Sequence, residues 1–183
     1  ILLLEGQSAT QPGGVATFEA FRKRLNENSL EKYEVDFDHL DLARFPGEAH
    51  AERAARYLGE KHAQKPLDLV VPNGRGSLRT LLHYRGSIAA NVPIVYCCVT
   101  QAVADALNVP SDAVGVLTEY NWFETLALAK RLQPGVRNLV TISGASEADR
   151  AWQAELLRAI EPEFDKFNVR HLAGLPRDEL LKD

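Results

Sequence analysis

The stretch AVGVLTEYNWFETLALAKRLQPGVRNLVTISGAS, residues 113–146, decides the fold. It holds two short apolar runs, residues 113–117 and 138–142, and each run is followed by a polar loop and a helical pattern. Apolar runs of this length between turn residues indicate buried strands, and the spacing of Phe123, Leu126 and Leu132 indicates an amphipathic helix. Strand, helix and strand in succession predict a parallel βαβ unit.

The same alternation extends over the whole chain. Further strands are predicted at residues 1–4, 33–37, 67–71, 94–99 and 167–171, and further helices at residues 15–28, 48–64, 101–107, 147–160 and 176–182. Ser77 is predicted to cap one more helix, ending near Arg85. The sequence therefore predicts an α/β fold with doubly wound parallel sheets. Ligands of such sheets bind at the carboxyl ends of the strands, which are polar and rich in small residues here.

Composition narrows the function classes. A length of 183 residues suits one ordinary domain or two small lobes. A formal net charge of −4 argues against a nucleic-acid partner. The apolar runs are far shorter than the roughly 18 residues of a membrane helix. The chain has no methionine, so Ile1 is not the initiator, and we expect membrane contact only through segments outside this chain.

Residues 73–77, NGRGS, are the nearest approach to a nucleotide loop. The third glycine of a dinucleotide fingerprint is missing, with Arg79 in its place, and no Walker lysine follows. Two interpretations stay open: a glycine-rich turn into a helix, and a backbone nest facing a small polar ligand, which we favour. Cys97 and Cys98 are adjacent, which strains a mutual disulfide and does not match zinc spacing. They are predicted to be small residues at the end of a buried strand, with a metal or redox role as the alternative.

Catalytic patterns are sparse. A nucleophile elbow is absent, and no catalytic residue, metal ligand or cofactor is predicted. His39 follows a strand near the predicted site, but the flanking Asp38 and Asp41 equally suit capping. An enzyme, such as a transferase, would need His39, Asp41 and Glu119 to converge. Three further histidines lie in helical patterns and are predicted at the surface: His50, His62 and His83.

Residues 119–122, EYNW, form a polar and aromatic cluster after a buried strand. Such a cluster suits a ligand with a ring and hydrogen-bonding groups. The alternative is that Asn121 caps the following helix and Trp122 packs on the surface. Both interpretations stay open from the sequence.

Three stretches carry a resemblance to a known family: HLDLARFPGEAHAERAARYLGEKHAQKPLDLVV (residues 39–71), VPIVYCCV (92–99) and GVLTEYNWFETLALAKRLQPGVRNLVTISG (115–144). Together they resemble the type 1 periplasmic-binding-protein-like sensor domains at the N-terminus of bacterial sensor histidine kinases. Those domains are similar to the substrate-binding proteins of ABC transporters. The resemblance covers nearly the whole chain.

The resemblance implies two Rossmann-like parallel-sheet lobes that close on a ligand. The first lobe would span residues 1–100, the linker residues 101–112 and the second lobe residues 113–183. The second lobe would be incomplete, since the family's second lobe has further strands, and its free sheet edge would suit a homodimer. The ligand-binding residues that the resemblance implies are Gln7, Ser8, Asn73, Gly74, Val99 and Thr100 in the first lobe, and Glu119, Tyr120, Asn121, Ser143, Gly144 and Ser146 in the second.

The function that the resemblance implies is extracytoplasmic ligand sensing. The domain would bind a small polar or aromatic molecule between its lobes, without catalysis, in the periplasm and as part of an inner-membrane histidine kinase. The alternative is the substrate-binding component of an ABC transporter, and an α/β enzyme is the third hypothesis.

Overall fold

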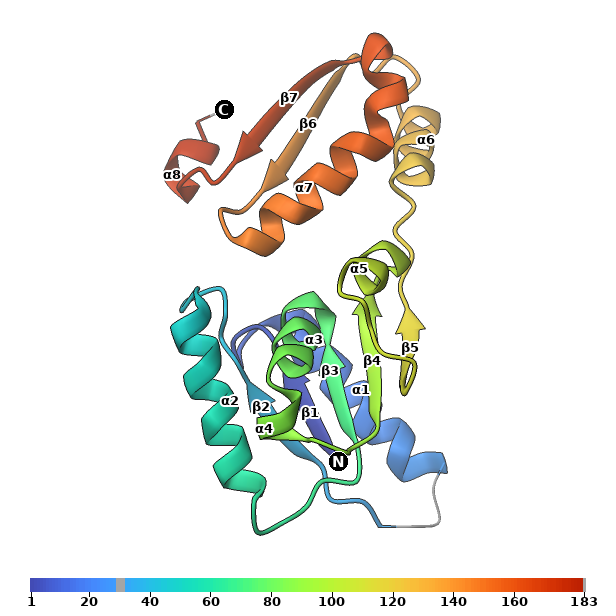
Figure 1. The fold of residues 1–183 in the computed structure, drawn as a ribbon. Helices are drawn as coiled ribbons and strands as arrows, with labels where there is room; N and C mark the ends of the chain where they lie inside the picture. Colours follow the sequence, from blue (N-terminus) through green and yellow to red (C-terminus); the bar gives the residue numbers. More distant parts are fainter. Residues whose placement is uncertain (29–31, 183) are drawn as a thin grey trace. The chain divides into compact units, whose positions relative to one another are not determined.

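The computed structural model describes residues 1–28 and 32–182. It divides into two compact units, Ile1–Glu119 and Tyr120–Asp183. Figure 1 shows the elements of each unit. The units are described here separately, as unit 1 and unit 2.

Unit 1 is built on a parallel sheet, which confirms the predicted α/β class. The described residues form five strands in the order β2-β1-β3-β4-β5, and every neighbouring pair is parallel. β2 and β3 begin three residues later than predicted, because both pair in register with β1. The strands are β1 (Leu2–Glu5), β2 (Asp36–His39), β3 (Val70–Asn73), β4 (Ile94–Val99) and β5 (Ala113–Leu117).

Helices cover both faces of this sheet (Figure 1). On one face, Leu2 and Leu4 of β1 pack with Leu58 of α2 and Leu81 of α3. On the other face, Phe18 of α1 stacks on Phe37 of β2, with ring centroids 4.1 Å apart. Coverage on both faces explains why β1, β3 and β4 are apolar runs. The expectation that residues 113–117 form a buried strand is wrong, because this edge strand leaves Val114 65% and Val116 63% exposed. The helices are α1 (Pro12–Asn28), α2 (Glu48–His62), α3 (Gly74–His83), α4 (Arg85–Ile88) and α5 (Gln101–Ala106).

Three expectations about local structure are wrong. β3 passes directly into α3, which begins at Gly74, so residues 74–77 are helix and do not form a loop. Gly74 has a φ of +83°, a left-handed conformation that glycine allows, and this makes the direct passage possible. Ser77 therefore lies inside the helix, where its hydroxyl donates to the Asn73 carbonyl at 2.6 Å. His62 was expected at the surface but is buried at the end of α2.

The resemblance implies that residues 113–117 belong to the second lobe. The structure instead pairs Ala113–Leu117 with β4, from Ile94 opposite Ala113 to Val99 opposite Leu117. The compact unit accordingly runs to Glu119.

Unit 2 contains a second parallel sheet. Among its described residues, β6 and β7 pair in register from Asn138 opposite Asn168 to Ser143 opposite Ala173. Leu126, Ile160 and Phe167 form the core beneath this sheet. The elements are α6 (Trp122–Leu132), β6 (Asn138–Ser143), α7 (Glu147–Ile160), the 3-10 helix η1 (Glu161–Lys166), β7 (Asn168–Ala173) and α8 (Arg177–Leu180).

Candidate ligand-binding site

The strand order of unit 1 has a topological switch point between β1 and β3. The chain leaves β1 toward β2 on one side and returns through β3 on the other, so connections diverge at the carboxyl ends of these two strands. Ligands of doubly wound sheets bind at such a point. Glu5 ends β1, Asn73 ends β3 opposite it, and Cys97 lies opposite Asn73 on β4. These three residues form what we call the switch-point cluster.

A buried carboxylate anchors the switch-point cluster. Glu5 is only 4% exposed. One of its oxygens accepts from the Gln7 backbone N–H at 3.1 Å, and the other accepts from the Asn73 side-chain amide at 2.5 Å. A Cβ at Gly14 would lie 2.9 Å from the same carboxylate, so the first turn of α1 also packs on it. The positive end of that helix favours a negative charge here.

Asn73 joins the carboxylate to the thiols. Its Oδ1 accepts from the Cys97 thiol at 3.4 Å, while its Nδ2 donates to Glu5. An asparagine amide has two N–H groups and two lone pairs, so one N–H and one lone pair of Asn73 are left for a ligand. Asn73 is half-buried, which leaves that remaining capacity accessible.

The two cysteines differ from the sequence expectation. Cys97 is half-buried, but Cys98 is exposed and is not part of a buried strand end. A hydrogen bond between the two thiols, together with burial, raises the pKa of Cys97. The same hydrogen bond lowers the pKa of Cys98 to about 7, against the opposing effects of burial and of the Glu5 charge.

The other predicted residues of unit 1 have mixed roles. Gln7 is half-buried in the loop after β1, and no hydrogen bond of its side-chain amide to another described residue is present. Ser8 shares a hydrogen bond with Thr10 in the same loop. Val99 is 1% exposed and belongs to the core. Thr100 caps α5 by accepting from the Val103 N–H at 3.3 Å.

Two of the side chains that an enzyme would need, His39 and Asp41, have partners of their own in unit 1, and the third, Glu119, is exposed at the end of this unit. His39 ends β2, where its ring packs edge-on against Phe37. Asp38 forms an ion pair with Lys61 at 2.7 Å. Asp41 forms one with Arg44 at 3.2 Å.

In unit 2, the predicted residues lie at the carboxyl end of β6. Ser146 and Asp149 form a capping box at the start of α7, with the Asp149 N–H donating to the Ser146 hydroxyl at 3.1 Å. A Cβ at Gly144 would collide with the Asp149 carboxylate, so glycine is needed there. The buried Ser143 hydroxyl has no hydrogen-bond partner among the described residues. Among the predicted residues of unit 2, Ser143 is therefore the one whose hydroxyl has unused hydrogen-bonding capacity.

Unit 2 also contains an aromatic cluster of Tyr120, Trp122 and Trp152. The Tyr120 ring meets Trp152 edge-on at 4.3 Å and stacks with Trp122 at 5.8 Å. Tyr120 is 39% exposed and Trp152 is 36% exposed, so the cluster presents ring surface to solvent. Asn121 caps α6 by accepting from the Glu124 N–H at 2.9 Å. Capping was one of the two interpretations left open for residues 119–122.

Sequence reasoning missed Glu5, the two thiols and Trp152 as site residues. Glu5 meets the criterion that pointed to the other site residues, because it is a polar residue directly after an apolar strand run. Trp152 lies in the middle of α7, about 30 residues after its ring partners, and no local pattern indicates that contact.

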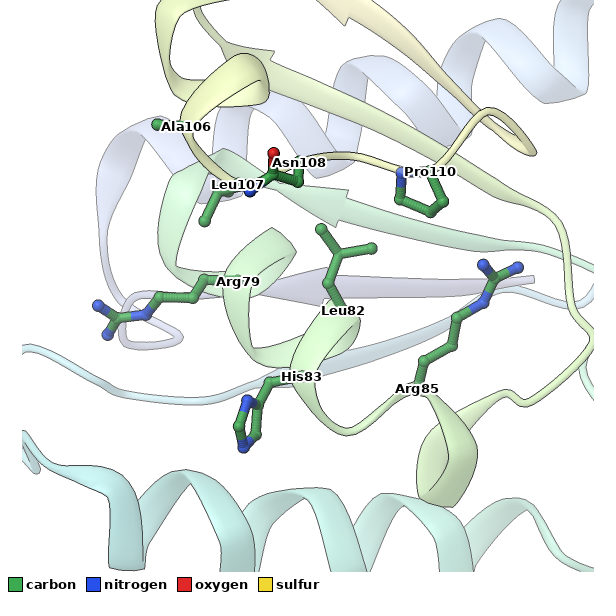
Figure 2. Close-up of a pocket in the computed structure, with 8 residues that line it drawn as sticks. All are labelled: Arg79, Leu82, His83, Arg85, Ala106, Leu107, Asn108 and Pro110. Carbon is green, nitrogen blue, oxygen red and sulfur yellow. The ribbon is translucent and has the colours of Figure 1, made fainter.

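A separate pocket of about 480 Å³ lies on the flank of unit 1 (Figure 2). It lies between the second half of α3 and the segment that follows α5, and none of the predicted site residues lines it. Two of its nitrogen-bearing side chains already have partners: Arg85 binds Asp112 at 3.0 and 2.7 Å, and His83 lies 3.5 Å from Glu48. The switch point has the better-placed polar groups, so we take it as the candidate site.

The described residues show neither a metal-binding cluster nor a membrane-spanning helix. They hold no group of three or more His, Cys, Asp or Glu side chains placed to bind a metal ion. None of the helices described here has the length and apolar character needed to cross a bilayer.

Comparison with known proteins gives structural relatives only. No protein-family model and no curated protein matches the chain. A conserved domain protein from Vibrio cholerae matches with a TM-score of 0.69 at 16% identity, over 99% of this chain and 60% of its own. An ABC domain from Streptococcus pneumonia in complex with L-Trp matches with a TM-score of 0.63 at 17% identity, over 94% and 56%.

A ligand-free, open substrate-binding protein with adhesive properties from Clostridium difficile matches with a TM-score of 0.59 at 16% identity, over 99% of this chain and 60% of its own. The chain thus spans 56% to 60% of the length of these three proteins. At such identities the likeness concerns the fold, and this chain has the α/β fold of substrate-binding proteins.

Proposed function

We propose that this chain is the ligand-binding part of a substrate-binding protein and binds a small molecule outside the cytoplasmic membrane. The observation that carries the proposal is the switch-point cluster. Asn73 retains amide capacity at the place where doubly wound sheets bind ligands, and the neighbouring Gln7 amide is unpartnered among the described residues.

The buried Glu5 carboxylate supports a binding role over a catalytic one. It is held by two donors and is 4% exposed, so it orients Asn73 and does not reach a substrate. Asp38 and Asp41 are held in ion pairs with Lys61 and Arg44, which favours a structural role for both carboxylates over an acid–base pair with His39.

The aromatic cluster supports a ligand that carries a ring. The rings of this cluster are exposed, and they already pack on one another both by stacking and edge-on. A further aromatic ring packs favourably in either of these two geometries. The bound L-Trp of the Streptococcus pneumonia relative is a ligand of this kind. We therefore propose a small polar molecule with an aromatic ring, such as an aromatic amino acid. That one ligand contacts both units stays a prediction of the sequence analysis.

Transport and sensing are two uses of such a protein. The structural relatives include the Clostridium difficile substrate-binding protein and the Streptococcus pneumonia ABC domain, which supports transport. The sensor-kinase role, the inner-membrane setting and the homodimer stay predictions. The full-length product distinguishes the two uses, because a membrane helix followed by a kinase domain fits sensing, whereas binding to a transporter permease fits transport.

A thermal-shift screen with amino acids, aromatic acids and sugars tests the proposal. A ligand present at about 100 times its Kd stabilises the folded state by about 2.7 kcal/mol. We expect saturable stabilisation by ring-containing amino acids without turnover. Stabilisation by sugars alone would contradict the ligand class, and chemical conversion of any hit would contradict the binding function.

Two variants then locate the contacts by calorimetry with the best hit. Gln7→Ala removes a hydrogen bond worth about 0.5–1.5 kcal/mol, so we expect the Kd to rise about 2- to 12-fold. Trp152→Ala removes a ring contact of about the same worth. Matched controls are Gln64→Ala and Leu128→Ala, which replace exposed side chains outside the site. Equal affinities of Gln7→Ala and Gln64→Ala would remove Gln7 from the site.

A further inference from the structure

The end of β4 holds a pair of thiols in an unusual backbone setting. The ladder with β5 shifts its register between Cys97 and Val99: Cys97 lies opposite Val116, and Val99 lies opposite Leu117. Cys98 is therefore left out of the ladder as the extra residue of a bulge. Its φ is +55°, in the left-handed region that side chains rarely adopt. The bulge holds the Cys98 thiol exposed at the carboxyl edge of the sheet while its neighbours stay in the strand.

The pKa values of the two thiols are shifted in opposite directions. The Cys97 hydrogen bond lowers the pKa of Cys98 to about 7, so close to half of Cys98 is thiolate at neutral pH. The same hydrogen bond raises the pKa of Cys97, followed by burial, and keeps it a thiol. The single Cys97 proton is shared between Asn73 Oδ1, at 3.4 Å from the sulfur, and the Cys98 sulfur, and Glu5 opposes ionisation of both thiols. The thiolate is the reactive form of cysteine, so reactivity concentrates on Cys98.

We propose that Cys98 is a site of S-thiolation by low-molecular-weight disulfides, with Cys97 as the residue that positions and activates it. In the step, the Cys98 thiolate attacks one sulfur of the disulfide, whose S–S bond breaks as the new Cys98 S–S bond forms. The other half leaves as a thiolate and takes a proton from water. The exchange conserves electrons, since one disulfide is consumed and one is made.

The mixed disulfide is the end point because Cys97 cannot resolve it readily. Resolution would need a Cys97–Cys98 disulfide, but adjacent Cα atoms lie about 3.8 Å apart. Disulfides usually span about 4.4–6.8 Å between Cα atoms, so the vicinal ring is strained. The raised pKa of Cys97 further removes the attacking thiolate. The adduct then remains at the edge of the sheet, one residue from the switch-point cluster.

Intact-mass spectrometry of the folded chain with glutathione disulfide at pH 7 tests the proposal. We expect one glutathione per chain, mapped to Cys98 by peptide analysis and absent in Cys98→Ser. Loss of two hydrogens would show a vicinal disulfide, and an adduct on Cys97, or no adduct on the folded chain, would show that Cys98 is not the reactive site. Each of these outcomes overturns the proposal.

The pH dependence of the reaction tests the role of Cys97. With a chromogenic aromatic disulfide, the rate of the unaltered chain should rise with a midpoint near pH 7. In Cys97→Ala the midpoint should move to about 8.5 or above, the ordinary value for a cysteine. The thiolate fraction at pH 7 then falls about 16-fold, and the gain in nucleophilicity recovers about fivefold, which leaves a net slowing of about threefold. If Cys97→Ala fails to fold, a midpoint near 8.5 in the unaltered chain is enough to refute the activation.

Discussion

Replacing Asn73 by alanine tests whether the switch-point cluster is held together as described. Asn73 gives the buried Glu5 carboxylate its side-chain donor at 2.5 Å, and Glu5 is 4% exposed, so water has little access to replace that donor. The Gln7 N–H stays on the other oxygen at 3.1 Å. The variant therefore leaves one oxygen of a buried charge without a partner.

The expected loss of stability follows from that one carboxylate oxygen without a hydrogen-bond donor. A buried acceptor left unsatisfied costs about 1–3 kcal/mol, and a charged one lies toward the upper end. Asn73 is also the N-cap residue of α3, but its side chain makes no cap hydrogen bond, so the usual capping cost of about 1 kcal/mol does not add. We expect Asn73→Ala to lower the free energy of unfolding by about 2–3 kcal/mol.

Urea unfolding followed by two signals measures this loss. Trp122 and Trp152 are the two tryptophans of the chain, and both lie in unit 2, so tryptophan fluorescence reports on unit 2 while far-UV circular dichroism also follows unit 1. The circular-dichroism transition should move to lower urea in Asn73→Ala. The control Asn91→Ala, at an exposed turn, should stay within about 0.5 kcal/mol.

A double-mutant cycle separates the contact from other effects of the substitution. Glu5→Gln removes the charge, so Asn73→Ala should cost less in that background, with a coupling of about 0.5–3 kcal/mol. An Asn73→Ala protein as stable as the unaltered chain, or a cycle with no coupling, would show that Asn73 does not support the carboxylate.

Two further predictions concern packing and pH. Gly59→Ala would drive a Cβ into the Ser87 carbonyl, so we expect a loss of about 1–3 kcal/mol in urea unfolding. Gly86→Ala meets nothing within 4 Å and should gain up to about 1 kcal/mol, and equal behaviour of the two would contradict the close helix packing. The Arg85 hydrogen bond lowers the pKa of Asp112, so its stabilisation is present above the unfolded value of about 3.9 and is lost as pH falls through the lower folded value. Asp112→Asn should accordingly lower the Tm at pH 7 but not near pH 2, and a pH-independent difference would contradict the pairing.

Much of the fold could be predicted from local sequence. Apolar runs ending in polar residues gave the strands, and helical spacing gave α2, α6 and α7 within a few residues of their observed bounds. These patterns are local. A strand that is buried on both faces needs a continuous run of apolar residues, and a helix that is buried on one face needs apolar residues at helical spacing. The alternation of the two then requires parallel connections, and the structure has them.

Local sequence could not predict which residues meet at the sheet edge. Glu5 and Asn73 are 68 residues apart, and only the in-register pairing of β1 with β3 brings them together. The same holds for Tyr120 and Trp152, whose contact depends on how α7 packs in unit 2. Such contacts depend on strand order and helix packing, which the whole chain sets.

For the opening stretch, residues 113–146, the sequence by itself determined a strand, a helix and a second strand in succession, but the predicted parallel βαβ unit is wrong, because the two strands belong to different sheets. The tertiary structure decided that its first strand completes the sheet of unit 1 and that its second strand, Asn138–Ser143, begins the sheet of unit 2. An apolar strand pattern predicts a strand but does not say which neighbouring strand it pairs with or how much of it is covered, and Val116 of the first strand and Ile142 of the second are 63% and 64% exposed. That choice follows from the backbone hydrogen bonds that β4 offers at its free edge, and a linear pattern does not contain them.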